Sequence, residues 1–167
     1  MRHDPAFRFL ADTGNGTIQV RRSFSAPRQM VWDCHTRAEL LDRWFAPKPL
    51  TTKTASMDFR EGGQWHHAMV APDGTEYWGI VRFDTINPID RYTTTDFFSD
   101  AEGARNTALP ASTWDVRFDE TQTGTRVSTL IAYATPEDLR TVIDMGMEEG
   151  MAATLDKLDD LLAQLTA

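Results

Sequence analysis

The stretch TPEDLRTVIDMGMEEGMAATLDKLDDLLAQL, residues 135–165, has the pattern of a long amphipathic helix. Thr135 and Pro136, with the carboxylate of Asp138 three residues after the threonine, are typical of the first turn of a helix. No proline follows before the end of the chain. At about 100° per residue, one face collects apolar or small side chains: Ile143, Met147, Gly150, Met151, Thr154, Leu155, Leu158, Leu161, Leu162 and Leu165. We therefore expect one helix of roughly 30 residues, about 45 Å long.

Two glycines four residues apart, Gly146 and Gly150, lie in the middle of this stretch among Met145, Met147 and Met151. A glycine inside a helix costs roughly 1 kcal/mol relative to alanine, so a compensating gain is expected. Either the helix backbone approaches a sheet closely here, or the missing side chains leave a hollow that the flexible methionines line. The two explanations are compatible, and the sequence does not choose between them.

Length and composition indicate one globular domain. The chain has 167 residues, of which 41% are hydrophobic and 25% are charged, as is usual for soluble proteins. A net charge of −8 without a lysine or arginine cluster argues against nucleic acid and against anionic membranes as partners. The single cysteine, Cys34, cannot form an internal disulfide and fits a reducing compartment. No apolar run or signal peptide indicates membrane insertion or export, so we expect a cytoplasmic protein.

The first third of the chain predicts an arm, a strand and two short helices. Residues 1–16 read as a loosely held arm, and residues 17–24 alternate in polarity as a strand does. Ser25-Ala26-Pro27 is expected to start one helix, and Thr36-Arg37-Ala38-Glu39 has the form of a capping box for a second. Pro47 and Pro49 would end the second helix. Residues 17–167 are therefore taken as a single domain that follows a short N-terminal arm.

The middle of the chain predicts strands joined by tight turns. Their ranges are 51–59, 64–70, 75–84, 91–98, 112–119 and 125–133. Hairpin connections give an antiparallel sheet. Because one helix cannot cover both faces of such a sheet, we expect the sheet to curl around the C-terminal helix. This is an α+β fold, and it commonly encloses a cavity between sheet and helix.

Three stretches resemble a bacterial family named after the C-terminal domain of the activator of heat-shock-protein-90 ATPase. They are FSAP at 24–27 with WF at 44–45, DFREGGQW at 58–65 with PDG at 72–74, and GMEEGM at 146–151 leading into LDKL at 155–158. The family belongs to the START-like (SRPBCC, helix-grip) superfamily, which also contains birch pollen allergens and polyketide cyclases. The resemblance covers about residues 17–165 and implies the helix-grip fold. It implies no activity, because the family has no shared catalytic motif.

His66 and His67 do not predict a metal site. Neighbours on a strand point to opposite faces, so the two rings cannot bind one ion together, and no zinc motif is present. If Trp65 and Met69 face inward, His67 does so too, either as a hydrogen-bonded core residue or as a polar group inside a pocket. Asp96 lies within a strand, and we expect it to pair with basic side chains on the outer face of the sheet.

Aromatic residues are frequent, and either they fill the core of a curled sheet or they line a cavity for a flat or aliphatic ligand. Arg140, near the start of the last helix, is either a surface side chain or a partner for an acidic ligand group. The candidate cavity residues, taken together, are Trp44, Phe45, Trp65, His67, Met69, Tyr77, Trp114, Arg140, Ile143, Met147, Gly150 and Met151.

Three functions follow from these observations. The first is binding of a small apolar or amphipathic ligand, without a metal or other cofactor, between sheet and helix. The second is an enzyme of the cyclase, aromatase or hydrolase kind, with His67, Tyr77 or Asp96 as acid or base. The third is a chaperone-associated stress-response partner, against which the short segment before the first predicted strand argues. The sequence favours binding over catalysis, establishes none of these three residues as catalytic, and leaves open whether the protein is a monomer or a homodimer.

Overall fold

The computed structural model describes residues 7–167 and contains one antiparallel sheet of eight strands, in the order β1-β2-β8-β7-β6-β5-β4-β3. The prediction of an α+β fold is confirmed. Hairpins join β3 through β8 in sequence order, whereas β2 pairs with β8 across the length of the chain. The strands are β1 (Arg8–Asp12), β2 (Thr17–Phe24), β3 (Thr51–Met57), β4 (Gln64–Val70), β5 (Glu76–Asn87), β6 (Arg91–Phe98), β7 (Ser112–Glu120) and β8 (Thr125–Tyr133).

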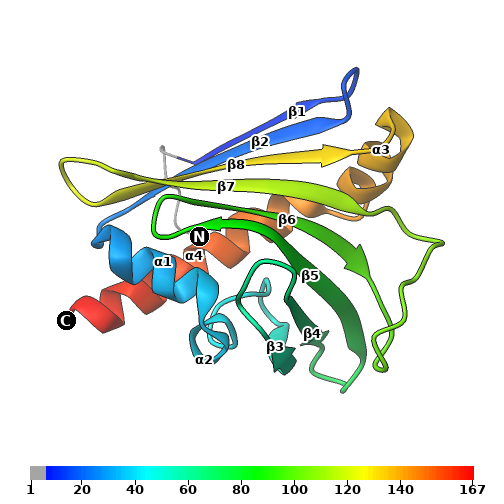
Figure 1. Ribbon diagram of the computed structural model, residues 1–167, viewed down its shortest axis with the longest axis horizontal. Helices are drawn as coiled ribbons and strands as arrows, with labels where there is room; N and C mark the ends of the chain where they lie inside the picture. Colours follow the sequence, from blue (N-terminus) through cyan, green and yellow to red (C-terminus); the bar gives the residue numbers. More distant parts are fainter. Residues whose placement is uncertain (1–6) are drawn as a thin grey trace.

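The sheet curves around the C-terminal helix α4 (Met147–Thr166), as Figure 1 shows. Two short helices, α1 (Arg28–Thr36) and α2 (Ala38–Leu41), lie near the C-terminal half of α4, and α3 (Pro136–Asp144) lies toward its other end. Trp32 of α1 is central to the core and packs edge-on against three aromatic rings, of Phe59, Tyr92 and Phe118. Leu158 and Leu162 of α4 are buried in the same core. Sheet and helices therefore share one core.

The prediction of one helix over residues 135–165 is wrong, because two helices occupy this range. The start is as predicted: the Thr135 side chain accepts a hydrogen bond from the backbone N–H of Asp138 at 3.1 Å. The first helix ends at Asp144, and Gly146 then adopts a φ of 89° before α4 begins at Met147. This left-handed conformation is strained for residues with a Cβ. Gly146 therefore ends one helix and permits the next to start in a new direction.

Two expectations for the first third of the chain also need correction. Residues 8–12 are not a loose arm but the edge strand β1, which pairs with β2. The two short helices consequently follow the second strand; residues 1–6 of the expected arm lie outside the described residues. Thr36 does not cap α2: its hydroxyl donates to the carbonyl of Trp32 one turn back, and the residue at the N-cap is Arg37. The capping-box sequence is used instead to end α1.

Within residues 7–167, no helix combines the length and the apolar character needed to cross a bilayer.

Candidate functional site

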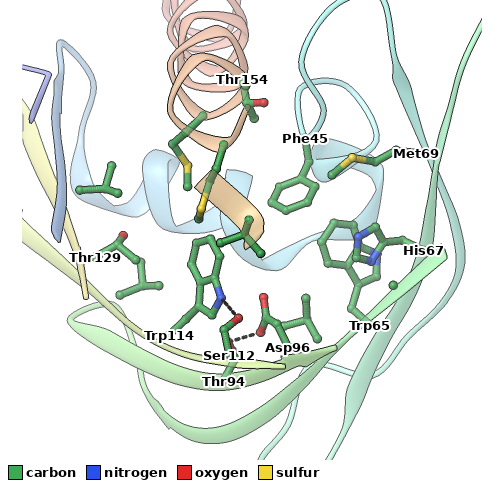
Figure 2. Close-up of a pocket in the computed structure, with 18 of the residues that line it drawn as sticks. Phe45, Trp65, His67, Met69, Thr94, Asp96, Ser112, Trp114, Thr129 and Thr154 are labelled. Atoms are coloured by element: carbon green, nitrogen blue, oxygen red, sulfur yellow. Dashed lines mark hydrogen bonds between the residues drawn. The ribbon is translucent and has the colours of Figure 1, made fainter. Parts of the chain in front are cut away.

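A cavity of about 450 Å³ lies between the concave face of the sheet and the junction of α3 with α4. Figure 2 shows it with the sheet as its floor, α4 above it and Phe45 at one side. Ten of the twelve candidate cavity residues line it: Trp44, Phe45, Trp65, His67, Met69, Tyr77, Trp114, Met147, Gly150 and Met151. Most of the wall is therefore apolar or aromatic.

The sheet register explains which side chains form the floor. Trp65 on β4 lies opposite Val81 on β5, Val81 lies opposite Asp96 on β6, and Asp96 lies opposite Ser112 on β7. Ser112 in turn lies opposite Tyr133 on β8. Cross-strand partners point to the same face of a sheet. All five side chains therefore face the cavity in one row that crosses five strands.

Polar side chains interrupt the apolar floor at the β6–β8 end of this row. The Thr94 hydroxyl donates to Oδ1 of Asp96 at 2.6 Å, and the Trp114 indole N–H donates to Oγ of Ser112 at 2.8 Å; both bonds are drawn in Figure 2. The Tyr133 hydroxyl reaches the sulfur of Met147 on α4 at 3.9 Å. We call Thr94, Asp96, Ser112, Trp114 and Tyr133 the polar cluster.

Asp96 is not on the outer face, so the expectation that it pairs there with basic side chains is wrong. Its carboxyl lines the cavity and is enclosed by protein, although the residue as a whole is half-buried. Burial raises the pKa of Asp96 to about 7; the Thr94 hydrogen bond opposes this effect, and the negative charge of Asp84 adds to it. A carboxyl group with such a pKa exists in both protonation states at neutral pH and can donate or accept a proton.

His66 and His67 point to opposite faces, as predicted. Nε2 of His66 lies 3.0 Å from the carbonyl oxygen of Asp100, in the loop beyond β6. His67 lines the cavity and is 5% exposed, and its Nδ1 has no hydrogen-bond partner among the described residues. Burial lowers its pKa to about 4, so the ring is neutral at pH 7. Within residues 7–167, no three potential metal ligands lie together.

The helical wall identifies the role of the two glycines. A Cβ built on Gly150 would meet only the side chain of Pro47, at 3.7 Å, and one built on Gly146 would meet nothing within 4 Å. No atom of the sheet lies close to either glycine, so close helix–sheet approach does not explain them. Both glycines line the cavity. Gly150 leaves space in its wall, whereas Gly146 provides the left-handed turn between the helices.

Two candidates from the same stretch do not reach the cavity. Arg140 is exposed and pairs with Glu137 at 3.7 Å. Ile143 packs against the core, and the α3 side chain that lines the cavity is Val142. Both predictions assumed an unbroken helix. The turn at Gly146 changes the direction of the chain. The residues of α3 that would extend the cavity-facing side of α4 in one straight helix therefore do not face the cavity.

Sequence reasoning missed several polar residues of the wall. Thr94, Ser112 and Tyr133 of the polar cluster are not among the candidate cavity residues, nor are Arg22, His35 and Thr129. A signal for one of them was present, since Ser112 alternates with Trp114 on its strand. Arg22 is 2% exposed, and its guanidinium group lies 3.0 Å from Asp156 on α4. This ion pair links β2 to α4 at the wall of the cavity.

A curled antiparallel sheet that holds a long C-terminal helix over a cavity defines a helix-grip protein, and comparison with known proteins agrees. The family model described as "Activator of Hsp90 ATPase homolog 1-like protein" matches residues 25–163. This chain belongs to that family. A comparison with curated proteins gave no match.

Solved structures of bacterial proteins share the whole fold. Protein Ms6760 from Mycobacterium smegmatis is 29% identical, with a TM-score of 0.86 over 95% of this chain and 97% of its own. A protein from Arthrobacter aurescens is 26% identical, with a TM-score of 0.88 over 94% and 91%. The AHSA1 protein from Silicibacter pomeroyi, at 21% identity and a TM-score of 0.71 over 89% and 98%, supports the fold alone.

Proposed function

We propose that this protein binds a small apolar or amphipathic molecule in the cavity between its sheet and α4. The observation that carries the proposal is the cavity itself: about 450 Å³ of space with a mainly apolar wall and a few polar groups in one region. Pockets of this size and composition are typical of small-molecule sites. A packed core leaves few voids larger than a water molecule, so a cavity of this size calls for a functional explanation.

The test is binding of Nile red, an uncharged dye whose emission rises in apolar surroundings. Thr129 and Leu130 are neighbours on β8 and provide a matched pair of variants. Thr129 lines the cavity, whereas Leu130 is 43% exposed on the opposite face. Thr129→Phe should fill the cavity and weaken dye binding at least tenfold, and Leu130→Phe should leave it unchanged. Equal binding by both variants, or none by the original protein, would refute the proposal.

Native mass spectrometry of the protein purified from its own host complements this test. A molecule retained in the cavity adds its mass to the protein, and Thr129→Phe should remove that added mass while Leu130→Phe retains it. This measurement identifies the ligand rather than a substitute for it.

Acid–base catalysis on the bound molecule is a second candidate, because Asp96 lines the same cavity with a pKa raised to about 7. Acids and bases that work near neutral pH need pKa values in this range. A molecule recovered from Asp96→Asn purified from the same host should then be converted by the original protein and remain unchanged with Asp96→Asn. Unchanged recovery after incubation with either protein would leave binding alone as the function.

A further inference from the structure

We infer that the ligand is a lipophilic amine, with an ammonium group held by the Asp96 carboxylate and an apolar body in the rest of the cavity. This inference rests on the proposed function and specifies its ligand class. Three features of the cavity support it. The Asp96 carboxyl group has no basic partner among the described residues, the basic groups of the wall are either paired or neutral, and aromatic rings lie beside the carboxyl.

Asp96 is the acidic residue of the cavity wall and has no basic partner in the part of the chain that the structure describes. No lysine, arginine or histidine nitrogen of residues 7–167 lies within 4.0 Å of its carboxylate. Only the Thr94 hydroxyl donates to it, at Oδ1; Oδ2 accepts no hydrogen bond from a described residue. A buried carboxylate without a cation is costly. A ligand that supplied the cation would remove this cost.

The basic groups of the cavity do not offer a matching site for an anion. Arg22 lies at the wall but faces the carboxylates of Asp156 at 3.0 Å and Asp159 at 3.8 Å. Burial lowers the pKa of both His35 and His67 to about 4, so both rings are neutral at pH 7. The interior therefore favours a positive ligand over a negative one.

Aromatic rings beside Asp96 add to this preference. Trp114 lies two residues beyond Ser112, the cross-strand partner of Asp96, and Tyr133 lies across from Ser112 in the same row. Figure 2 shows the Trp114 ring and the Asp96 carboxyl together on the floor of the cavity. Ammonium groups are attracted to the faces of such rings. A carboxylate next to aromatic rings is thus a suitable receptor for an alkylammonium head.

Binding of an amine should depend on pH, because Asp96 must lose its proton to pair with an ammonium group. Because the pKa of Asp96 is about 7, binding an ammonium group below that pH releases the carboxyl proton to solvent. Amine affinity should therefore rise about 30-fold from pH 5.5 to pH 8.5, tenfold per pH unit below 7. Among the other titratable groups of the wall, His35 and His67 have pKa values near 4 and burial raises the pKa values of Tyr92 and Tyr133, so these four stay neutral over that range. Arg22 is paired with Asp156.

The experiment is displacement of Nile red by three molecules that share one phenylbutyl chain: phenylbutylamine, phenylbutanol and phenylpentanoic acid. At pH 8.5 the amine should bind at least tenfold more tightly than the alcohol, and the acid more weakly than both. Only the amine should gain affinity as the pH rises. Asp96→Asn should remove the preference for the amine and its pH dependence while it retains Nile red binding. Leu130→Phe, on the opposite face of the sheet, should retain both.

The outcomes separate this inference from the proposed function. Failure of Nile red to bind the original protein refutes the proposed function. Dye binding with no preference for the amine at pH 8.5, or with the preference intact in Asp96→Asn, refutes the inference alone. Circular dichroism of each variant, matched to that of the original protein, confirms that the comparison is made between folded proteins.

Discussion

Trp65 and His67 stack face to face on the inner side of β4, with ring centroids 3.8 Å apart and an interplanar angle of 16°. The stack is possible because residues two apart on a strand share a face. Phe45 closes it from the side, edge-on to both rings at 4.9 Å and 5.5 Å. The imidazole is thereby removed from water, and this burial lowers its pKa to about 4.

The first prediction concerns acid sensitivity. An unfolded histidine titrates near pH 6.5, so unfolding takes up a proton wherever the pH lies between that value and about 4. The neutral His67 ring contributes its full share of the unfolding free energy above pH 6.5, and this share decreases as the pH falls toward 4. Between pH 7 and pH 5 this residue should cost about 2 kcal/mol of unfolding free energy. His67→Gln should remove that share of the loss in urea denaturation at the two pH values. An NMR midpoint near 6.5 for the His67 ring would contradict the prediction.

The second prediction has the opposite sign. The pKa of Asp96 is raised from 3.8 to about 7, so the group favours the folded state below pH 4 and this advantage is lost as the pH rises through 7. Asp96→Asn should therefore raise the unfolding free energy at pH 8 by about 1–3 kcal/mol, with no such gain at pH 4. Asp115 provides the contrast, because hydrogen bonds from Arg91 lower its pKa. Asp115→Asn should destabilise the protein at pH 8; equal effects of the two variants would be inconsistent with this account.

The third prediction concerns the turn between β3 and β4. A Cβ on Gly63 would lie 2.2 Å from the backbone oxygen of Asp58, so the turn has no room for a side chain. Gly63→Val should lower the melting temperature by several degrees, or about 1–3 kcal/mol. Gly14→Ala is the control: its Cβ would meet only a side-chain oxygen of Asp12, at an ordinary 3.5 Å. A thermal melt that shifts equally for both variants would show that the turn is unconstrained.

The fourth prediction tests the space left by Gly150. Leucine at this position gains up to ~1 kcal/mol of helix propensity, and its Cβ meets only Pro47 at a normal contact distance. Gly150→Leu should therefore retain or increase the melting temperature and lose Nile red binding, because its side chain enters the cavity. A loss of more than about 2 kcal/mol would instead indicate overpacking.

Gly146 serves as the comparison for that variant. Its φ of 89° is strained for any residue with a Cβ, and a Cβ there would meet nothing within 4 Å. Gly146→Ala should consequently lower stability by about 1 kcal/mol and leave dye binding in place. The two glycines of one motif should thus respond in opposite ways.

The sequence predicted the order of strands and helices well but not the break in the last helix. Alternating polarity and tight turns are local signals, and they located the six strands of the middle and end of the chain. The break at Gly146 was missed because residues 137–165 contain no proline. Gly150, in the same motif, remains helical, so glycine content alone does not identify which residue leaves the helix.

The sequence predicted those parts of the candidate site that lie on a single strand. Trp65 and His67 were placed on the inner face by alternation along β4. Asp96, Ser112 and Tyr133 come from three strands, and only their register brings them together. That register depends on pairings across the whole sheet, which no pattern within a single strand specifies. The polar cluster was therefore the part that sequence reasoning could not assemble.

The division of the cavity wall has a consequence for how such proteins diversify. The polar cluster lies on β6, β7 and β8, whereas the space beside it is set by Gly150 and its methionine neighbours on α4. Strand substitutions would change which chemical group is recognised, and helix substitutions would change how large a molecule fits. The two sets share no position and meet where the Tyr133 hydroxyl contacts the sulfur of Met147. Away from that contact, a single substitution can change one property and leave the other intact.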